Sequence, residues 1–201
     1  VKQVVVVGGG TAGWLTAANL AKKFDSSNNQ AIQVTLVESP DIPTVGVGEG
    51  TWPTMRKTLA KLGISEATFL AKCNASFKQA TKFVNWQQAP KNGVNNHYYH
   101  LFTSINDPLE FNLAPYWKLG VIGQDRSYAD TVSMQAAICE LGLAPKLITN
   151  KEFEGIQNYA YHLDAGLFTD LLRDHATTNL GVKHISANVT DVNLDDDGYI
   201  A

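Results

Sequence analysis

The segment from Val4 to Leu20, VVVVGGGTAGWLTAANL, constrains the fold of this chain more than any other. Four consecutive valines predict a parallel strand buried on both faces, and a glycine turn into a helix follows them. Gly8, Gly10 and Gly13 have the spacing G-x-G-x-x-G. In that motif glycines permit a tight turn, close approach of the backbone to a pyrophosphate and close packing of helix on strand. The segment therefore predicts the start of a dinucleotide-binding βαβ unit, although such a motif also occurs as an ordinary glycine turn.

An acidic residue stands where this unit would bind a ribose. We expect the first helix to end at Phe24 and a second buried strand to span Ile32 to Val37, directly before Glu38. A carboxylate about 20 residues past the glycines accepts hydrogen bonds from ribose hydroxyls and repels a phosphorylated ribose. Glu38 therefore favours NAD or FAD over NADP. The alternative is a solvated acid at a strand end.

The composition excludes several classes of protein. The 201 residues are 44% hydrophobic and 17% charged, with a net charge of -3 and no basic cluster, which argues against a nucleic-acid surface. No apolar run approaches the ~20 residues of a membrane span, and the early first strand leaves no room for a signal peptide, so we expect a cytoplasmic protein. Cys73 and Cys139 have neither metal-binding nor disulfide spacing. We expect buried thiols and no metal site.

The remaining pattern predicts an α/β fold in which one domain is interrupted by another. The elements expected after the second strand are a loop at Ser39–Thr51, helices at 53–62 and 66–72, strands at 77–86 and 97–102, a short helix at 116–119, a helix from Ser127 to Leu141, a strand at 158–163, a helix from Asp164 to Gly181 and a strand at 182–185. Residues 1–52 and 158–201 would form the dinucleotide-binding domain, and 53–157 an inserted substrate-side region.

The last residues predict a hairpin. A strand from Val189 to Leu194, a turn at 195–198 and a returning strand at 199–201 follow from the sequence. Because so short a two-stranded unit is marginal, we expect the natural chain to continue.

The two middle strands carry the candidate substrate contacts. Alternation places Lys78 and Lys82 on one face of the first strand, and Tyr98, His100 and Phe102 on one face of the second. The second face predicts either an aromatic wall for a ligand or ordinary cross-strand packing.

Five segments in the same order resemble the flavin-dependent tryptophan halogenases. They are GGGTAGW at 8–14, GVGEGTWP at 46–53, ASFKQATKFVNW at 75–86, YYHLF at 98–102 and AYHLDAGLFTDLL at 160–172. The resemblance covers essentially the whole chain but only the N-terminal part of that family. It implies an FAD-binding Rossmann-like domain of the glutathione-reductase and hydroxylase type.

The resemblance also implies a reaction. In the family, FAD reduced by a separate flavin reductase, dioxygen and a halide ion yield hypohalous acid, which travels to a lysine beside the substrate indole. That lysine matches Lys78, with Lys82 as the alternative within the same strand. It would either form a chloramine or hold hypohalous acid by hydrogen bonding. The resemblance is also compatible with a homodimer.

Further site residues follow from the resemblance. Substrate contacts match Pro53, His100 and Phe102, the latter two stacking on the indole. The residues that match cofactor contacts are Gly8, Gly10, Thr11, Ala12, Gly13, Glu38, Ser39, Ile42, Gly48, Glu49, Gly50 and Val189. The halide site would lie beyond Ala201.

Three functions remain open at this point. The first is FAD-dependent halogenation of tryptophan, or of another indole, in secondary-metabolite biosynthesis. The second is a flavin-dependent aromatic hydroxylase of similar fold, which needs no remote amine such as Lys78. The third is a dinucleotide-binding fragment without activity of its own.

Overall fold

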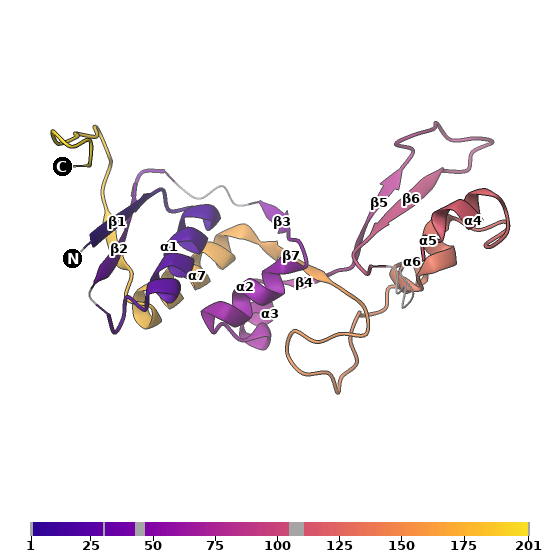
Figure 1. Ribbon diagram of the computed structural model, residues 1–201, viewed down its shortest axis with the longest axis horizontal. Coiled ribbons are helices and arrows are strands. Elements are labelled where there is room, and N and C mark those ends of the chain that lie inside the picture. The colour runs from indigo at the N-terminus through magenta and orange to yellow at the C-terminus, as the bar shows by residue number, and fades with distance from the viewer. Residues whose placement is uncertain (1, 30, 43–46, 105–110, 201) are drawn as a thin grey trace. The chain divides into compact units, whose positions relative to one another are not determined.

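The computed structural model describes residues 2–29, 31–42, 47–104 and 111–200, and its elements are labelled in Figure 1. The chain forms two compact units. The first comprises residues 1–49, 58–75 and 163–201, and the second comprises residues 50–57 and 76–162. Residues 58–75, which the sequence analysis assigned to the insertion, thus group with the first unit. A division of labour between a cofactor domain and a substrate domain stays a prediction.

The first unit is built on a parallel sheet with the strand order β1-β2-β8. Strand β1 (Lys2–Val7) pairs with β2 (Ile32–Glu38), and β2 pairs with β8 (Lys183–Ser186). Helix α1 (Thr11–Phe24) connects β1 to β2 and ends at the predicted residue. The predicted βαβ unit is confirmed.

Helices α1 and α7 (Ala165–Asn179) pack together in the core of this unit. The inward side of α1 is formed by Trp14 and three alanines, all buried. Asp164 caps α7 as predicted, since its side chain accepts a hydrogen bond from the amide of Leu167. Small residues on α1 let the two helices approach closely. Because α1 follows β1 after only three glycines, its first residues lie beside the carboxyl end of that strand.

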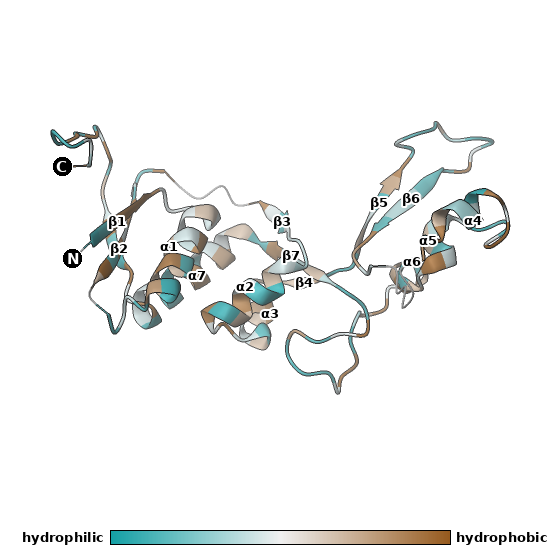
Figure 2. Cartoon of the chain, in the orientation of Figure 1, coloured by the Kyte–Doolittle hydropathy of each residue, from teal (hydrophilic) through white to brown (hydrophobic). Residues whose placement is uncertain are grey.

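The expectation that β1 is buried on both faces is wrong. Figure 2 shows β1 as hydrophobic beyond its first residues, yet Val5 and Val7 are 48% and 63% exposed. Within the described part of the chain β1 lies at the edge of the sheet, whereas Val34 and Leu36 of the central strand β2 are buried. An apolar run does not distinguish an edge strand from a central one.

Two short helices of the next segment agree with the sequence. Helix α2 (Thr54–Leu62) ends before Gly63, and α3 (Glu66–Lys72) is capped by Ser65, which accepts from the amide of Thr68. The segment before them, predicted as a loop, contains the short strand β3 (Gly48–Gly50). Residues 43–46 of that predicted loop lie outside the described residues.

The predicted single strand at 77–86 is wrong, because it consists of two strands in different sheets. Strand β4 (Ser76–Lys78) pairs antiparallel with β7 (Ala160–Asp164), and β3 flanks the other side of β7. Strand β5 (Ala80–Val84) forms a hairpin with β6 (His97–Leu101). Lys78 and Lys82 therefore do not share one sheet face.

The long helix predicted from Ser127 to Leu141 is interrupted. Ser127 caps α5 (Tyr128–Val132) as predicted, but Ser133 is extended and a separate helix α6 (Gln135–Glu140) follows. The side chain of Ser133 accepts a hydrogen bond from the amide of Gln135, the first residue of the new helix. The short helix α4 (Ala114–Lys118) lies near its predicted position at 116–119, and residues 105–110 of the preceding segment lie outside the described residues.

The strand predicted from Val189 to Leu194 is absent from the described residues, where the only pairing of that segment is an isolated bridge from Leu194 to Ile200. The turn is present, since the amide of Asp195 donates to Tyr199 and that of Gly198 to Asp195. Val189 and Leu194 are exposed, so no packed neighbour stabilises a strand there. Ala201 lies outside the described residues. None of the helices in the described ranges is long and apolar enough to span a bilayer.

Candidate functional site

A pocket of about 630 Å³ lies at the carboxyl ends of β1, β2 and β8 in the first unit. This edge of a parallel sheet is where α/β proteins bind their ligands. The lining comes from the glycine turn, the end of β2 with the loop that follows it, β3 and the segment after β8. The volume is within the range of pockets that hold small organic ligands.

The glycine turn gives the pocket a row of backbone amides. Gly8 has a φ of +115°, and its amide donates to the carbonyl of Val37. A Cβ on Gly13 would collide with the carbonyl oxygen of Gly8, so helix and turn touch there. Gly10 begins α1 without a side-chain cap. The first amides of α1 therefore face the pocket unpaired by a capping side chain, and they favour an anionic ligand.

Glu38 lies at the end of β2 with its carboxylate held on two sides. Nε2 of His184 lies 2.8 Å from Oε1, and Oε2 lies so close to Gly9 that a Cβ on that glycine would collide with it. The side chain of Glu38 is 18% exposed and lines the pocket. It is positioned to accept hydrogen bonds from ligand hydroxyls.

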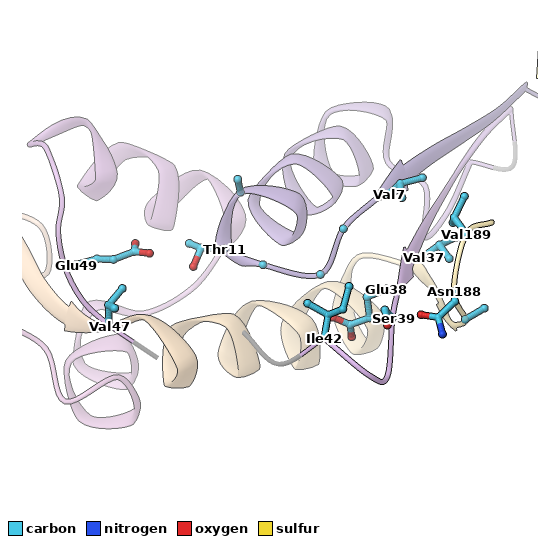
Figure 3. Close-up of a pocket in the computed structure, with 15 residues that line it drawn as sticks. Val7, Thr11, Val37, Glu38, Ser39, Ile42, Val47, Glu49, Asn188 and Val189 are labelled. Carbon is cyan, nitrogen blue, oxygen red and sulfur yellow. The ribbon is translucent and has the colours of Figure 1, made fainter. Parts of the chain in front are cut away.

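The pocket has two ends (Figure 3). Glu38 and Ser39 lie with Asn188 and Val189 on one side of the view, whereas Thr11, Val47 and Glu49 lie on the other. At the first end Asn188 donates to Asp41 at 2.6 Å, which ties the segment after β8 to the loop after β2.

Most of the predicted cofactor residues line this pocket. They are Gly8, Gly10, Thr11, Ala12, Glu38, Ser39, Ile42, Glu49 and Val189. Three predicted residues do not: Gly13 supports the turn, Gly48 follows the lining residue Val47, and Gly50 belongs to the second unit.

Sequence reasoning missed six lining residues. They are Val7, Gly9, Val37, Val47, Ala187 and Asn188. The rule that ligands bind beyond the carboxyl ends of parallel strands could have indicated Val7, Val37 and Ala187. Nothing in the sequence indicates Asn188.

Lys78, the predicted catalytic residue, lies at the end of β4 in the second unit, half-buried among aromatic rings. Its Nζ is 5.5 Å from the ring centre of Trp52 and 5.4 Å from that of Phe102, and it donates to the carbonyl of Thr51 at 3.4 Å. Cation–π attraction and the carbonyl together hold the ammonium group in place.

His162 is a neighbour of Lys78 that the sequence analysis did not single out. On Gly50, a Cβ would lie 3.0 Å from Nζ of Lys78 and 3.4 Å from Nδ1 of His162, so both nitrogens converge on this glycine. Burial first, and then the positive charge of Lys78, lower the pKa of His162. A neutral imidazole thus stands beside the lysine at pH 7.

The aromatic wall contains the two predicted residues and one more. The ring centres of His100 and Phe102 are 6.3 Å apart, and Trp52 lies 5.8 Å from the first and 5.5 Å from the second. Pro53 directly follows Trp52, just before α2. The site therefore joins an amine to a wall of rings that could stack on a flat aromatic ligand.

Lys82 is in a different environment. Its Nζ is 2.5 Å from Oε1 of Glu140, which also accepts from the hydroxyl of Tyr99. The ion pair occupies the amine of Lys82, whereas Lys78 has no carboxylate partner among the ion pairs of the described residues.

Comparisons with known proteins agree with these features. A family model described as tryptophan halogenase matches residues 3–201. The tryptophan 7-halogenase RebH of Lentzea aerocolonigenes is 35% identical over the whole chain, which covers 38% of that protein. A tryptophan halogenase structure from Shewanella frigidimarina is 41% identical with a TM-score of 0.91, and the chain covers 39% of it. A flavin-dependent halogenase structure from Xanthomonas campestris is 36% identical with a TM-score of 0.82 over the whole chain, which covers 38% of it. The chain thus spans about two fifths of the length of these relatives.

Proposed function

Because this chain belongs to the tryptophan halogenase family, we propose that it contributes the FAD pocket and the reactive lysine of an enzyme that halogenates tryptophan or another indole. The observation that carries the proposal is Lys78, whose Nζ lies beside the rings of Trp52 and Phe102 without a carboxylate partner in the described residues. The solved relatives include a flavin-dependent halogenase from Xanthomonas campestris, and the chain has a pocket beside its glycine turn that supports the proposal.

The residues of the pocket fit FAD. The free amides at the start of α1 suit a pyrophosphate, and Glu38 suits the hydroxyls of the adenosine ribose. The opposite end, near Glu49 and Val47, is left for the flavin. When bound and reduced, FAD would supply the electrons that activate dioxygen for oxidation of a halide ion. A separate flavin reductase would provide the reduced cofactor.

Lys78 would then act on the oxidised halide. As a neutral amine it attacks hypohalous acid, forming an N–halogen bond with release of water, whereas as an ammonium group it donates hydrogen bonds to the acid. The wall of Trp52, His100 and Phe102 would hold the indole in one plane beside the amine. Both routes place the halogen next to the ring that it substitutes.

The test uses the full-length protein that carries this chain, supplied with FAD, a flavin reductase with NADH, oxygen, a halide salt and tryptophan. Mass spectrometry should detect halogenated tryptophan. Lys78→Ala should lower product formation at least about a hundredfold while flavin oxidation continues. Lys82→Ala is the matched control, because Lys82 lies outside the site in an ion pair with Glu140. It should retain product formation.

Other products would lead to other conclusions. A hydroxylated indole would indicate the aromatic hydroxylase, in which oxygen transfer requires no remote amine. If the protein binds FAD but forms no product, the remaining interpretation is a dinucleotide-binding module without activity of its own. Halogenation that survives Lys78→Ala would remove the role assigned to the lysine.

A further inference from the structure

The carboxylate of Glu38 is held in one orientation by a residue from another strand. Strands β2 and β8 pair in register, with Leu36 opposite His184. This pairing brings Nε2 of His184 within 2.8 Å of Oε1 of Glu38, two residues further along β2. The interaction joins residues 146 positions apart in the sequence.

His184 is itself fixed by packing. The ring of Trp14, which is fully buried in α1, meets the imidazole edge-on with 5.3 Å between the ring centres. The imidazole is 30% exposed and can turn little without losing this contact. Trp14 thus sets the plane of His184, and His184 sets the position of Oε1.

The other carboxylate oxygen lies directly against the glycine turn. Oε2 lies against Gly9, where any Cβ would collide with it. A carboxylate accepts about four hydrogen bonds, so those lone pairs that neither His184 nor the turn occupies stay free for a ligand. The carboxylate is therefore oriented before a ligand binds.

We propose that His184 is a positioning residue of the cofactor pocket, which holds Glu38 ready for the ribose of the adenosine half of FAD. This rests on the proposed binding of FAD. A pre-oriented acceptor costs less ordering when the ligand binds. His184 acts only through Glu38, so its effect is confined to ligands that contain the adenosine half.

That restriction provides the test, because FMN contains the flavin but lacks the adenosine half. Full-length protein is titrated with FAD and with FMN, and binding is followed by flavin fluorescence. His184→Phe keeps a ring against Trp14 and removes the donor, whereas His184→Gln keeps a donor close to the position of Nε2. We expect His184→Phe to weaken FAD about tenfold and leave FMN unchanged, and His184→Gln to stay within about threefold of the wild type.

A double-mutant cycle with Glu38→Gln separates positioning from general stability. In the Glu38→Gln background, His184→Phe should cause little further loss of FAD affinity, since the acceptor that it positions is altered. His175→Phe is the control: His175 contacts the carbonyl of Leu62 in the same unit but does not line the pocket. It should leave the ratio of FAD to FMN affinity unchanged.

Several results would overturn the inference. These are an equal loss of FAD and FMN in His184→Phe, additive losses in the double mutant, or no rescue by His184→Gln. If His184→Phe fails to fold, His184→Gln and Glu38→Gln still decide, because Glu38→Gln must lower FAD affinity without affecting FMN. Wild-type protein that binds no FAD would contradict the proposed function itself, which distinguishes the two failures.

Discussion

Two glycines of one turn have different physical roles. Gly13 is required by the protein itself, because a Cβ there would meet the carbonyl oxygen of Gly8. Gly10 lines the pocket, has an ordinary φ of -75°, and has open space where a Cβ would be. Gly13 thus serves close packing within the turn, whereas Gly10 leaves open space at the pocket.

This difference predicts opposite phenotypes for two alanine variants. Gly10→Ala should melt like the wild type but bind FAD about tenfold more weakly or worse, because the new methyl group occupies the ligand's space. Gly13→Ala should lose about 1–3 kcal/mol of stability through overpacking. Thermal melts and FAD titrations measure both. Wild-type affinity in Gly10→Ala would show that the ligand does not approach this part of the turn.

Single residues were predictable where a local pattern determines them. The glycine spacing predicted Gly8 and Gly10, and the distance from those glycines predicted Glu38, which all line the pocket. His184 was not predictable in this way, since only the pairing of β2 with β8 brings it to Glu38. The family resemblance singled out Lys78, and its role stays a prediction.

At the scale of elements, one buried side chain joins three segments of the chain. Gln135, the first residue of α6, is fully buried and accepts hydrogen bonds from the amides of Phe102 and Thr103 at 2.9 and 2.8 Å. Its Nε2 donates to the carbonyl of Asn158 at 2.7 Å. One side chain thus fixes the end of the aromatic wall and ties α6 to the segment before β7.

Replacing this side chain should be costly. Gln135→Leu removes the partner of the Thr103 amide and of the Asn158 carbonyl, whereas the Phe102 amide keeps its hydrogen bond to the carbonyl of Gln79 at 3.3 Å. We expect the free energy of unfolding to fall by about 2–4 kcal/mol. Gln124→Leu is the control, because Gln124 is exposed and makes one bond to the carbonyl of Gly120. It should change stability by less than about 0.5 kcal/mol. Urea unfolding compares the two, and equal effects would contradict the role of Gln135.

These contacts explain why the sequence predicted helix or strand correctly in these segments but did not predict where each element is interrupted. Periodicity indicated a strand around Phe77 and a helix after Ser127, and both types are present. The breaks at Gln79 and Ser133 depend on partners far along the chain: Gln79 donates to the carbonyl of Leu143, and Gln135 binds Phe102. Patterns within a short window do not contain such partners.

For the whole molecule, a buried thiol couples stability to pH. Cys73 is fully buried, and burial, with a further contribution from Asp164, raises the pKa of its thiol to about 12. In the unfolded chain a cysteine ionises near pH 8.5. The folded protein keeps the proton of this thiol to higher pH than the unfolded chain does. The contribution of the thiol to the free energy of unfolding is therefore fully present below about pH 8.5 and decreases as the pH rises above that value.

We therefore expect alkaline destabilisation that depends on this cysteine. Between pH 8.5 and 10 the contribution of Cys73 should fall by up to about 1.4 kcal/mol per pH unit. Urea unfolding of wild type and Cys73→Ala at pH 7.5 and 9.5 measures it. The raised pKa of Cys139 acts in the same direction and remains in the variant. The same pH dependence in both proteins would contradict the assignment to Cys73.

The packing of α3 has a consequence for protein engineering. Phe69 meets Phe168 of α7 edge-on, and the carbonyl of Leu62, at the end of α2, contacts His175 of α7. A gene fragment that lacks 53–157 would lose these groups and expose the face of α7 that they cover. A chimaera that exchanges that whole block with a relative would separate them from the α7 against which they pack. Recombination should instead exchange 76–162 and retain 58–75 with the parent that supplies α7.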